Sequence, residues 1–473
     1  MKIFHKYSKD LFDGSTLHFA KSIALVMFVG GTLCSCADFL EIDLPNNQLT
    51  TEDIFDDYTT AEAALLNTYI QLRDVVLLTG TDTGLGITLG LYSDELDLYS
   101  VTSQSSQQFY INTILPTNSS IAPLWNGSYN VIYNLNTLIE RVGNSDFTED
   151  QKNQLIGESL FLRGLVHFYL VNLFGEIPYI KTTDFEENDD VIKQSRDTVY
   201  GFVIEDLQMA EQLLLGSTLA NKNRIGNKAV GALLARVYLY DNQYDLAAQN
   251  ASKLIDGSTY SLENNLNAVF LSGSLETIWQ FATNLPGSNT LEARSLIFTS
   301  TPPPNYALTN DLVASFDPQD GRRLAWIKTV VDSVSIYYHS FKYKENQNTG
   351  ATLENSVILR LSEQYLIRAE ARLRLGHVQG ALSDLNVIRE RAGLTPVSMT
   401  DPADLEGLIL IERQHEFFTE FGHRFFDLKR TGVIDEVLDM KKEGWDSTDK
   451  LFPLPDQELL INPNLRPQNV GYE

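Results

Sequence analysis

Apolar side chains recur every three or four residues through most of the chain after residue 58, which is the spacing of amphipathic helices. Between residues 121 and 142, for example, Trp125, Tyr129 and Ile132 fall on one side of such a helix. The same spacing predicts helices at residues 59–73, 121–142, 151–174, 197–215, 229–240, 244–255, 361–376, 378–392, 405–421 and 427–431. The pattern therefore predicts an all-α, mostly helical fold.

Two stretches interrupt this pattern. Residues 79–120 are rich in glycine and polar residues, and we interpret Gly84–Gly90 as a loop because its glycine spacing does not fit a dinucleotide-binding turn. Residues 256–358 are rich in Ser, Thr, Asn, Pro and Gly, with short β-prone runs at 278–282 and 334–343. We interpret this second stretch as a loop-rich insertion with a few short strands.

Two of the predicted helical pairs look like repeats of one another. Ala235 and Ala247 lie twelve residues apart, as do Ala369 and Ala381, and each pair brackets a short turn. This spacing of small residues resembles the tetratricopeptide repeat, in which two helices of a hairpin approach closely. Such hairpins usually present a scaffold or a binding face.

The N-terminus carries the features of an exported lipoprotein. An apolar run at residues 23–33 follows Lys21 and is too short to span a bilayer, but it fits the core of a signal peptide. Leu33 lies three residues before Cys36, with small residues between, which predicts cleavage after Ser35 and lipidation of Cys36. We therefore expect a signal peptide at 1–35, an extended tether at 36–58 and a single helical unit at 59–473. Cys34 and Cys36 are the only cysteines, so no disulfide framework is expected.

The net charge of −26 limits the class of ligand. A strongly acidic surface repels phosphate backbones, so nucleic acid is not expected as a partner. A neutral ligand, a basic ligand or a protein partner all remain compatible with this charge.

No motif predicts catalysis, a cofactor or a metal site. His415-Glu416 begins like a zinc-protease motif, but position 419 is Thr where the second histidine is required. We interpret the carboxylates near it as ion pairs along a helix face, formed by Glu412, Glu416 and Glu420 with Arg413 and Arg424. A glycosidase pair among the 62 acidic residues cannot be recognised from sequence.

Aromatic and polar side chains in the irregular stretches are the candidates for binding a ligand. Sugars lay their apolar faces on aromatic rings while carboxylates and amides bind their hydroxyl groups. The candidates are Tyr92, Asp94, Asp97, Tyr99, Asn284, Asn289, Tyr306, Tyr337 and Tyr338. The alternative is that Tyr92 and Tyr99 pack against the helical core and that Asp94 caps a turn. Trp125, Trp279 and Trp326 lie in periodic apolar stretches and are expected in the core.

Several segments of the chain resemble the SusD/RagB family. They are the run that begins Cys36-Ala-Asp-Phe-Leu-Glu, residues 157–178 (Gly-Glu-Ser-Leu-Phe-Leu-Arg-Gly through Phe-Gly-Glu-Ile-Pro), residues 360–371 continuing to 393, residues 412–430, and Leu451-Phe-Pro-Leu-Pro with Asn462-Pro-Asn. Five such segments in family order, after a lipidation signal, make the resemblance specific.

The resemblance implies a helical core with tetratricopeptide-like hairpins and a more irregular region that faces the ligand. It also implies a lipid-anchored outer-membrane protein at the cell surface that binds an oligosaccharide, or in some members a peptide. The bound nutrient would pass to a partner TonB-dependent transporter of the SusC type. Two alternatives stay open at this point: a tetratricopeptide-type scaffold for a protein partner, and a surface glycosidase.

Overall fold

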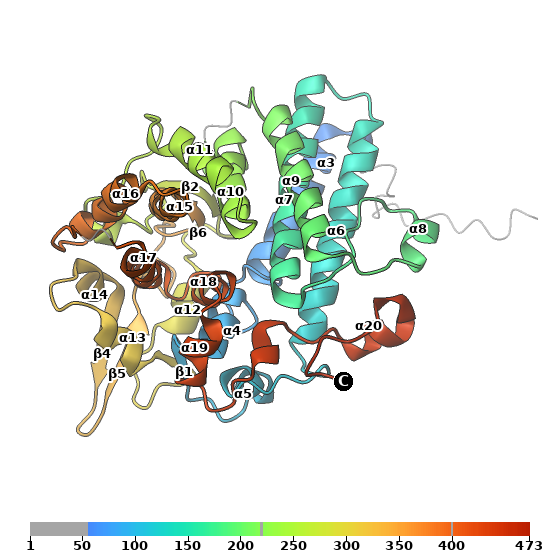
Figure 1. Cartoon of the computed structure of the whole chain (residues 1–473). Helices are drawn as coiled ribbons and strands as arrows, with labels where there is room; N and C mark the ends of the chain where they lie inside the picture. Colours follow the sequence, from blue (N-terminus) through green and yellow to red (C-terminus); the bar gives the residue numbers. More distant parts are fainter. Residues whose placement is uncertain (1–54, 218–220, 399–400) are drawn as a thin grey trace, which may run out of the picture. The chain divides into compact units, whose positions relative to one another are not determined.

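The structure, a computed structural model, describes residues 55–217, 221–398 and 401–473, and it is mostly helical (Figure 1). The all-α prediction is confirmed. Within these ranges no helix is both long and apolar enough to cross a membrane. The predicted signal peptide, the lipidation site Cys36 and the tether up to residue 54 lie outside the described residues.

The helices of the described residues are α3 (Tyr58–Asp74), α4 (Leu85–Tyr92), α5 (Gln104–Tyr110), α6 (Ile121–Gly143), α7 (Glu149–Phe174), α8 (Phe185–Asp189), α9 (Arg196–Leu213), α10 (Asn227–Tyr240), α11 (Tyr244–Ile255), α12 (Leu291–Leu296), α13 (Asn310–Ser315), α14 (Gly321–Trp326), α15 (Leu361–Arg374), α16 (Val378–Arg391), α17 (Pro402–Phe417), α18 (His423–Thr431), α19 (Ile434–Asp439) and α20 (Asp456–Ile461). The strands are β1 (Leu96–Leu98), β2 (Thr277–Phe281), β3 (Tyr306–Leu308), β4 (Ile327–Val331), β5 (Ile336–Ser340) and β6 (Ser356–Arg360).

Helix α7 is the central helix of the N-terminal half and packs between α6 and α9 (Figure 1). Thr148 caps its start, because its hydroxyl accepts a hydrogen bond from the Gln151 backbone while the Gln151 side chain accepts one from the Thr148 backbone. Gly175 ends the helix with a positive φ of 78°. Every side chain of the second half of α7 is buried, as expected for a helix that is covered on all sides.

The two predicted hairpins are present as α10–α11 and α15–α16. Ala235, Ala247, Ala369 and Ala381 are all fully buried. Each helix packs on its hairpin partner, and α11 packs on α15, so the two hairpins stack on one another. The small side chains therefore occur where two helices approach closely, as the spacing predicted.

Residues 256–358 contain more regular structure than predicted, in short pieces. Strand β2 pairs antiparallel with β6, β4 with β5, and β1 with β3. Trp279 and Trp326 are fully buried and belong to the main hydrophobic core, as does Trp125. The segment is therefore part of the same core and not a separate appendage.

The interpretation of Gly84–Gly90 as a loop is wrong, because Leu85–Tyr92 is helix α4. All of its residues except Gly86 are buried, and the helix is apolar on every side. Gly86 and Gly90 permit this packing: a Cβ would lie 2.8 Å from the Thr419 carbonyl oxygen at the first and 2.9 Å from Leu96 at the second. A fully apolar eight-residue run between turns has no amphipathic period, so periodicity alone missed it.

The predicted row of ion pairs on the 405–421 helix is also wrong, because these side chains are buried and pair with other segments. Glu416 contacts Arg322 at 3.0 Å, and Glu420 contacts Arg360 at 2.9 Å. Arg413 pairs with Asp427 and Arg424 pairs with Asp94. Buried charges need partners on several sides, which one helix face cannot supply.

Candidate ligand-binding site

Tyr99 and Tyr337 form a pair of partly exposed aromatic rings. Their centroids are 5.5 Å apart and their planes meet at 88°, an edge-to-face arrangement. Tyr99 follows β1, and its backbone N–H donates to the Asn305 carbonyl at 2.7 Å. Tyr337 lies on β5, and β5 lies against β3. Three short strands thus bring together residues that are more than 200 positions apart in the sequence.

Asp97 and Tyr110 extend this aromatic pair. The Tyr110 hydroxyl donates to the Asp97 carboxylate at 3.1 Å. Burial raises the pKa of Asp97, and burial together with this carboxylate raises the pKa of Tyr110 to about 12. Burial and the Asp97 charge likewise raise the pKa of Tyr99. The site therefore offers hydroxyl and carboxylate groups beside partly exposed rings.

A cavity of about 270 Å³ opens beside Asp97 and Tyr110. Lys441 and Lys442, which follow α19, line it together with Asp94 and Asp311. The Lys442 ammonium lies 4.4 Å from the centre of the Tyr110 ring. The volume approaches the range typical of small-molecule sites. Its lining of carboxylates, lysines and a tyrosine suits a polar ligand that can both donate and accept hydrogen bonds.

Asp94 lines this cavity but is held by an ion pair. Its two carboxylate oxygens each accept a hydrogen bond from Arg424 at 2.8 Å, and Lys441 lies 3.1 Å away. Burial alone would raise the pKa of Asp94, but Arg424 and Lys441 lower it to about 2. Asp94 is therefore an ionised group that fixes the wall of the cavity, and it does not cap a turn.

Tyr92 lies in the core and does not reach the surface. Its side chain is fully buried, its ring packs edge-on against Phe109 and Phe452, and its hydroxyl donates to the Asp449 carbonyl at 3.0 Å. The ligand-contacting role predicted for it is therefore wrong, and the alternative of packing against the core holds. The apolar sequence of α4 was the signal that placed it inside.

Tyr306 and Tyr338 support the exposed pair. Tyr306 is buried on β3 opposite Leu98 of β1, and Tyr338 is half-buried on β5 opposite Thr329 of β4. Both side chains pack against the main core. They position β3, which follows the Asn305 carbonyl that binds the Tyr99 backbone, and β5, which carries Tyr337.

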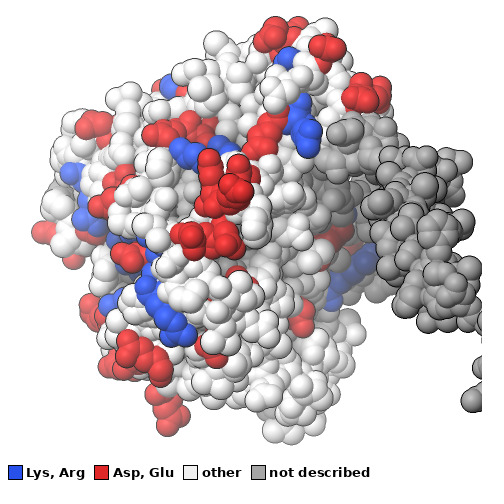
Figure 2. All heavy atoms as spheres, turned by 90° about the vertical axis from the view of Figure 1, so that its right-hand side faces the viewer, with Lys and Arg blue, Asp and Glu red and all other residues white. Residues whose placement is uncertain are grey.

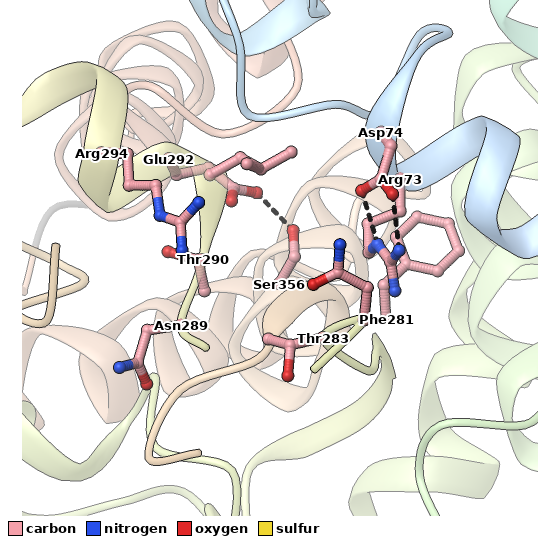
Figure 3. A pocket seen from close by; sticks show the side chains of 11 residues that line it. Arg73, Asp74, Phe281, Thr283, Asn289, Thr290, Glu292, Arg294 and Ser356 are labelled. Atoms are coloured by element: carbon pink, nitrogen blue, oxygen red, sulfur yellow. Dashed lines mark hydrogen bonds and ion pairs between the residues drawn. The ribbon is translucent and has the colours of Figure 1, made fainter. Parts of the chain in front are cut away.

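Asn284 and Asn289 belong to a different place in the fold (Figure 3). The Asn289 amide nitrogen donates to the Gln347 carbonyl at 2.9 Å, and its oxygen accepts from the Leu353 backbone at 3.0 Å. Asn289 is thus a buried clamp for the 347–354 loop, which argues against a role in ligand contact. Asn284 is exposed at the rim of a cavity of only about 40 Å³, which has room for water and not for a sugar ring.

Three of the charged side chains that line the pocket in Figure 3 have local partners. Arg73 donates to Asp74, and Ser356 donates to the buried Glu292. Burial raises the pKa of Glu292 to about 7. Because the cavity is too small for a sugar ring, we do not assign it to the ligand.

Sequence reasoning missed the two lysines of the cavity. Lys441 and Lys442 lie more than 340 residues from Asp97, and nothing in their local sequence distinguishes them from other charged surface residues. Only the fold brings them to β1. Among the described residues no cluster of three or more histidine, cysteine, aspartate or glutamate side chains could hold a metal ion.

The stacked helical hairpins, with short strands that carry a pair of partly exposed tyrosines beside a small polar cavity, define the class of fold. Two family models match the chain: one described as "Starch-binding associating with outer membrane" over residues 38–239, and one described as the SusD family over residues 332–472. The chain belongs to the SusD/RagB family, which confirms the resemblance found in the sequence.

Individual relatives span nearly the whole chain. The SusD-like protein P2 of Formosa agariphila is 27% identical, with 93% of this chain and 97% of that protein covered. The starch-binding protein SusD of Bacteroides thetaiotaomicron is 24% identical over 67% of this chain and 72% of its own length. A solved structure described as a laminarin-binding SusD-like protein is 26% identical and has a TM-score of 0.73, with 88% of this chain and 99% of that chain covered.

Proposed function

We propose that this protein binds an oligosaccharide at the cell surface and delivers it to a partner TonB-dependent outer-membrane transporter of the SusC type. The observation that carries the proposal is the pair of partly exposed rings, Tyr99 and Tyr337, beside the Asp97–Tyr110 hydrogen bond. Rings of this kind can contact the apolar face of a sugar, while the carboxylate accepts from its hydroxyl groups.

The family supports this ligand class over the alternatives. One relative is described as a starch-binding protein, and one solved structure as a laminarin-binding protein. Starch and laminarin are polymers of a neutral sugar. A net charge of −26 also favours a ligand without phosphate or sulfate groups. Binding of a peptide is the less favoured alternative, and the experiment below includes it.

The proposed role does not include catalysis. A glycosidase needs an acid and a second carboxylate about 5–10 Å apart, with pKa values pushed apart by their surroundings. Asp94 lies near Asp97, but Arg424 holds it ionised and engages both of its oxygens. Neither of its oxygens is left free to attack or protonate a sugar.

The location forms part of the same proposal. The family description associates these proteins with the outer membrane, and the signal before Cys36 would anchor the chain by lipid. More than one acyl chain is required for stable anchoring, which bacterial lipoproteins provide.

The test is a binding screen of the mature chain, from residue 36 and with Cys36→Ala, against a glycan array and a peptide panel. Each ligand that binds is recovered and analysed for cleavage. We expect an oligosaccharide to bind intact and Tyr99→Ala to weaken it about tenfold, because one aromatic contact is lost. Leu215→Ala is the matched control, since this side chain is 76% exposed at the end of α9 and outside the site.

Three results would contradict parts of this proposal. A cleaved oligosaccharide would show an enzyme, and binding only to peptides would change the ligand class. Equal affinities of Tyr99→Ala and Leu215→Ala for the oligosaccharide would show that the ligand does not bind at the Tyr99–Tyr337 site.

A further inference from the structure

A second, larger groove lies at another side of the protein. It has a volume of about 440 Å³ and is formed by α6, the segment that contains α8, and α20. Figure 1 shows these three helices together, away from the strands β4 and β5 that belong to the first site. Figure 2 faces this side of the molecule, and much of its lower part carries no charged side chains. The Tyr99–Tyr337 site does not explain this groove.

Aromatic rings follow one another along the wall that α6 provides. Trp125, Tyr129 and Tyr133 are spaced four residues apart, so they lie on one face of the helix and span about 12 Å. Trp125 is buried at the floor, with its ring 4.9 Å from that of Tyr129. The Tyr129 hydroxyl is fixed by donating to the Pro178 carbonyl at 2.8 Å. Tyr133 is 53% exposed at the mouth.

The opposite walls complete an apolar cleft. Phe185 of α8 is 75% exposed and Ile461 of α20 is 76% exposed, although both are large apolar side chains that line the groove. Exposed apolar surface of this extent, gathered in a concave place, is typical of a binding site. An isolated exposed side chain would need no explanation, but here several of them share one cleft.

Polar side chains with unused hydrogen-bonding capacity line the same groove. Asn126, Asp189 and Glu458 line the groove, and none of them forms a hydrogen bond or ion pair through its side chain with the described residues. They supply amide and carboxylate groups that can donate to and accept from a ligand. A lipid chain would leave these polar groups unpaired, which disfavours it.

We propose that this groove is a second oligosaccharide-binding surface, for a neutral sugar chain. Aromatic rings on one wall, with an amide and carboxylates of unused hydrogen-bonding capacity lining the same groove, match both faces of a sugar, the apolar one and the hydroxylated one. This inference rests on the proposed glycan-binding function and extends it. Two sites on one protein would hold a long glycan more tightly than either site alone, because the second contact becomes intramolecular.

The experiment uses the mature chain from residue 36, with Cys36→Ala, and compares four proteins in that background. They are the protein without further change, the groove variant Tyr133→Ala/Phe185→Ala, the Tyr99 variant Tyr99→Ala/Tyr337→Ala, and the control Leu215→Ala. Short and long oligosaccharides from starch and laminarin, and every neutral glycan that binds on an array, are titrated by calorimetry. Thermal unfolding of each variant confirms that it is folded, which we expect because the substituted groove side chains are largely exposed.

We expect the groove variant to bind short oligosaccharides through the Tyr99 site but to bind long ones about tenfold more weakly, with one binding event lost. The Tyr99 variant should still bind glycan through the groove. Unchanged binding of long glycans by the groove variant would overturn the second site and leave the proposed function standing. Absence of any glycan binding by the unaltered protein would overturn both.

Two further outcomes would reassign the groove. Binding of a peptide from the panel that is lost only in Tyr133→Ala/Phe185→Ala would make it a protein-docking site. A self-association in sedimentation that disappears with the same variant would make it an interface between two copies. Either result contradicts the oligosaccharide assignment.

Discussion

Asp94 and Arg424, which are 330 residues apart in the sequence, form a two-pronged ion pair with both distances at 2.8 Å. The pair joins the segment between α4 and β1 to α18. Both side chains are buried, so each depends on the other to compensate for its lost hydration. The wall of the cavity and the start of β1 are therefore held in place by a contact with the C-terminal part of the chain.

Removal of the arginine alone should destabilise the protein more than removal of both charges. Arg424→Met leaves a buried carboxylate with only Lys441 near it, and we expect a loss of about 3 kcal/mol in the free energy of unfolding. Asp94→Asn/Arg424→Met should recover part of this loss. Urea unfolding of the two variants measures the difference, and equal destabilisation would contradict this account of the pair.

The same ion pair predicts a dependence on pH. The pKa of Asp94 is lowered to about 2 from an ordinary 3.8, so the folded state binds fewer protons than the unfolded state between these values. Stability from Asp94 is present above about pH 4 and is lost as pH falls through 2. The difference in unfolding free energy between the unaltered protein and Asp94→Asn should therefore shrink over this range, whereas a constant difference would count against the ion pair.

The contribution of Glu95, the neighbour of Asp94, to the free energy of unfolding should change with pH in the opposite direction. Burial raises its pKa to about 8 from 4.5, and its one hydrogen bond, from the Thr419 backbone at 3.1 Å, does not offset this. The folded state then binds more protons between these values, so the contribution of Glu95 is full below pH 4.5 and is lost as pH rises through 8.

Replacement of this side chain by its neutral counterpart tests that direction. Glu95→Gln should be nearly neutral at pH 5 and should become more stable than the unaltered protein towards pH 8, by at most about 1.4 kcal/mol per pH unit. Unfolding by urea at several pH values measures it. Glu443→Gln is a suitable control, because this surface residue lies outside the core.

The helical fold was predictable because most of its long helices have an apolar face at helical spacing, and Ala235 with Ala247 marked a hairpin by spacing alone. Helix α4 was not, since an apolar run without a polar face has no period to detect. Of the candidate residues, Tyr99, Tyr337 and Asp97 were proposed because aromatic and acidic side chains in irregular segments suit a sugar, and the fold brings these three together. Their neighbour Lys442 was not found, because its place depends on pairing between distant segments.

Tyr92 and Tyr99 are both tyrosines of the candidate set, but they differ in burial, so their alanine variants should differ in stability. Tyr92→Ala should cost about 3–5 kcal/mol of stability, because it empties a packed aromatic cluster. Tyr99→Ala, at a position that is 36% exposed, should cost less than about 1 kcal/mol. Thermal or urea unfolding measures both. A mild effect of Tyr92→Ala would show that its ring is not part of the core.

The anchor prediction concerns two cysteines that are two residues apart. Cys36→Ala should release the protein from the membrane fraction, while Cys34→Ala should leave it anchored, because only Cys36 has the small residues and the leucine at the required distances before it. Fractionation of cells that produce each variant, with detection of the attached lipid, measures this. Release of the Cys34→Ala variant, with the Cys36→Ala variant still anchored, would assign the lipid to Cys34.

The Tyr99–Tyr337 pair should act as a unit in ligand binding. The rings contact each other edge-to-face at 5.5 Å, so loss of either one frees the other from its position. Each alanine variant should bind the oligosaccharide about tenfold more weakly, and the double variant should lose less than the product of the two, because contacting residues are not additive. Tyr99→Phe keeps the ring and should retain most of the affinity. Strict additivity of the two alanine variants would show that the rings act independently, and a strong effect of Tyr99→Phe would assign the contribution to the hydroxyl group in place of the ring.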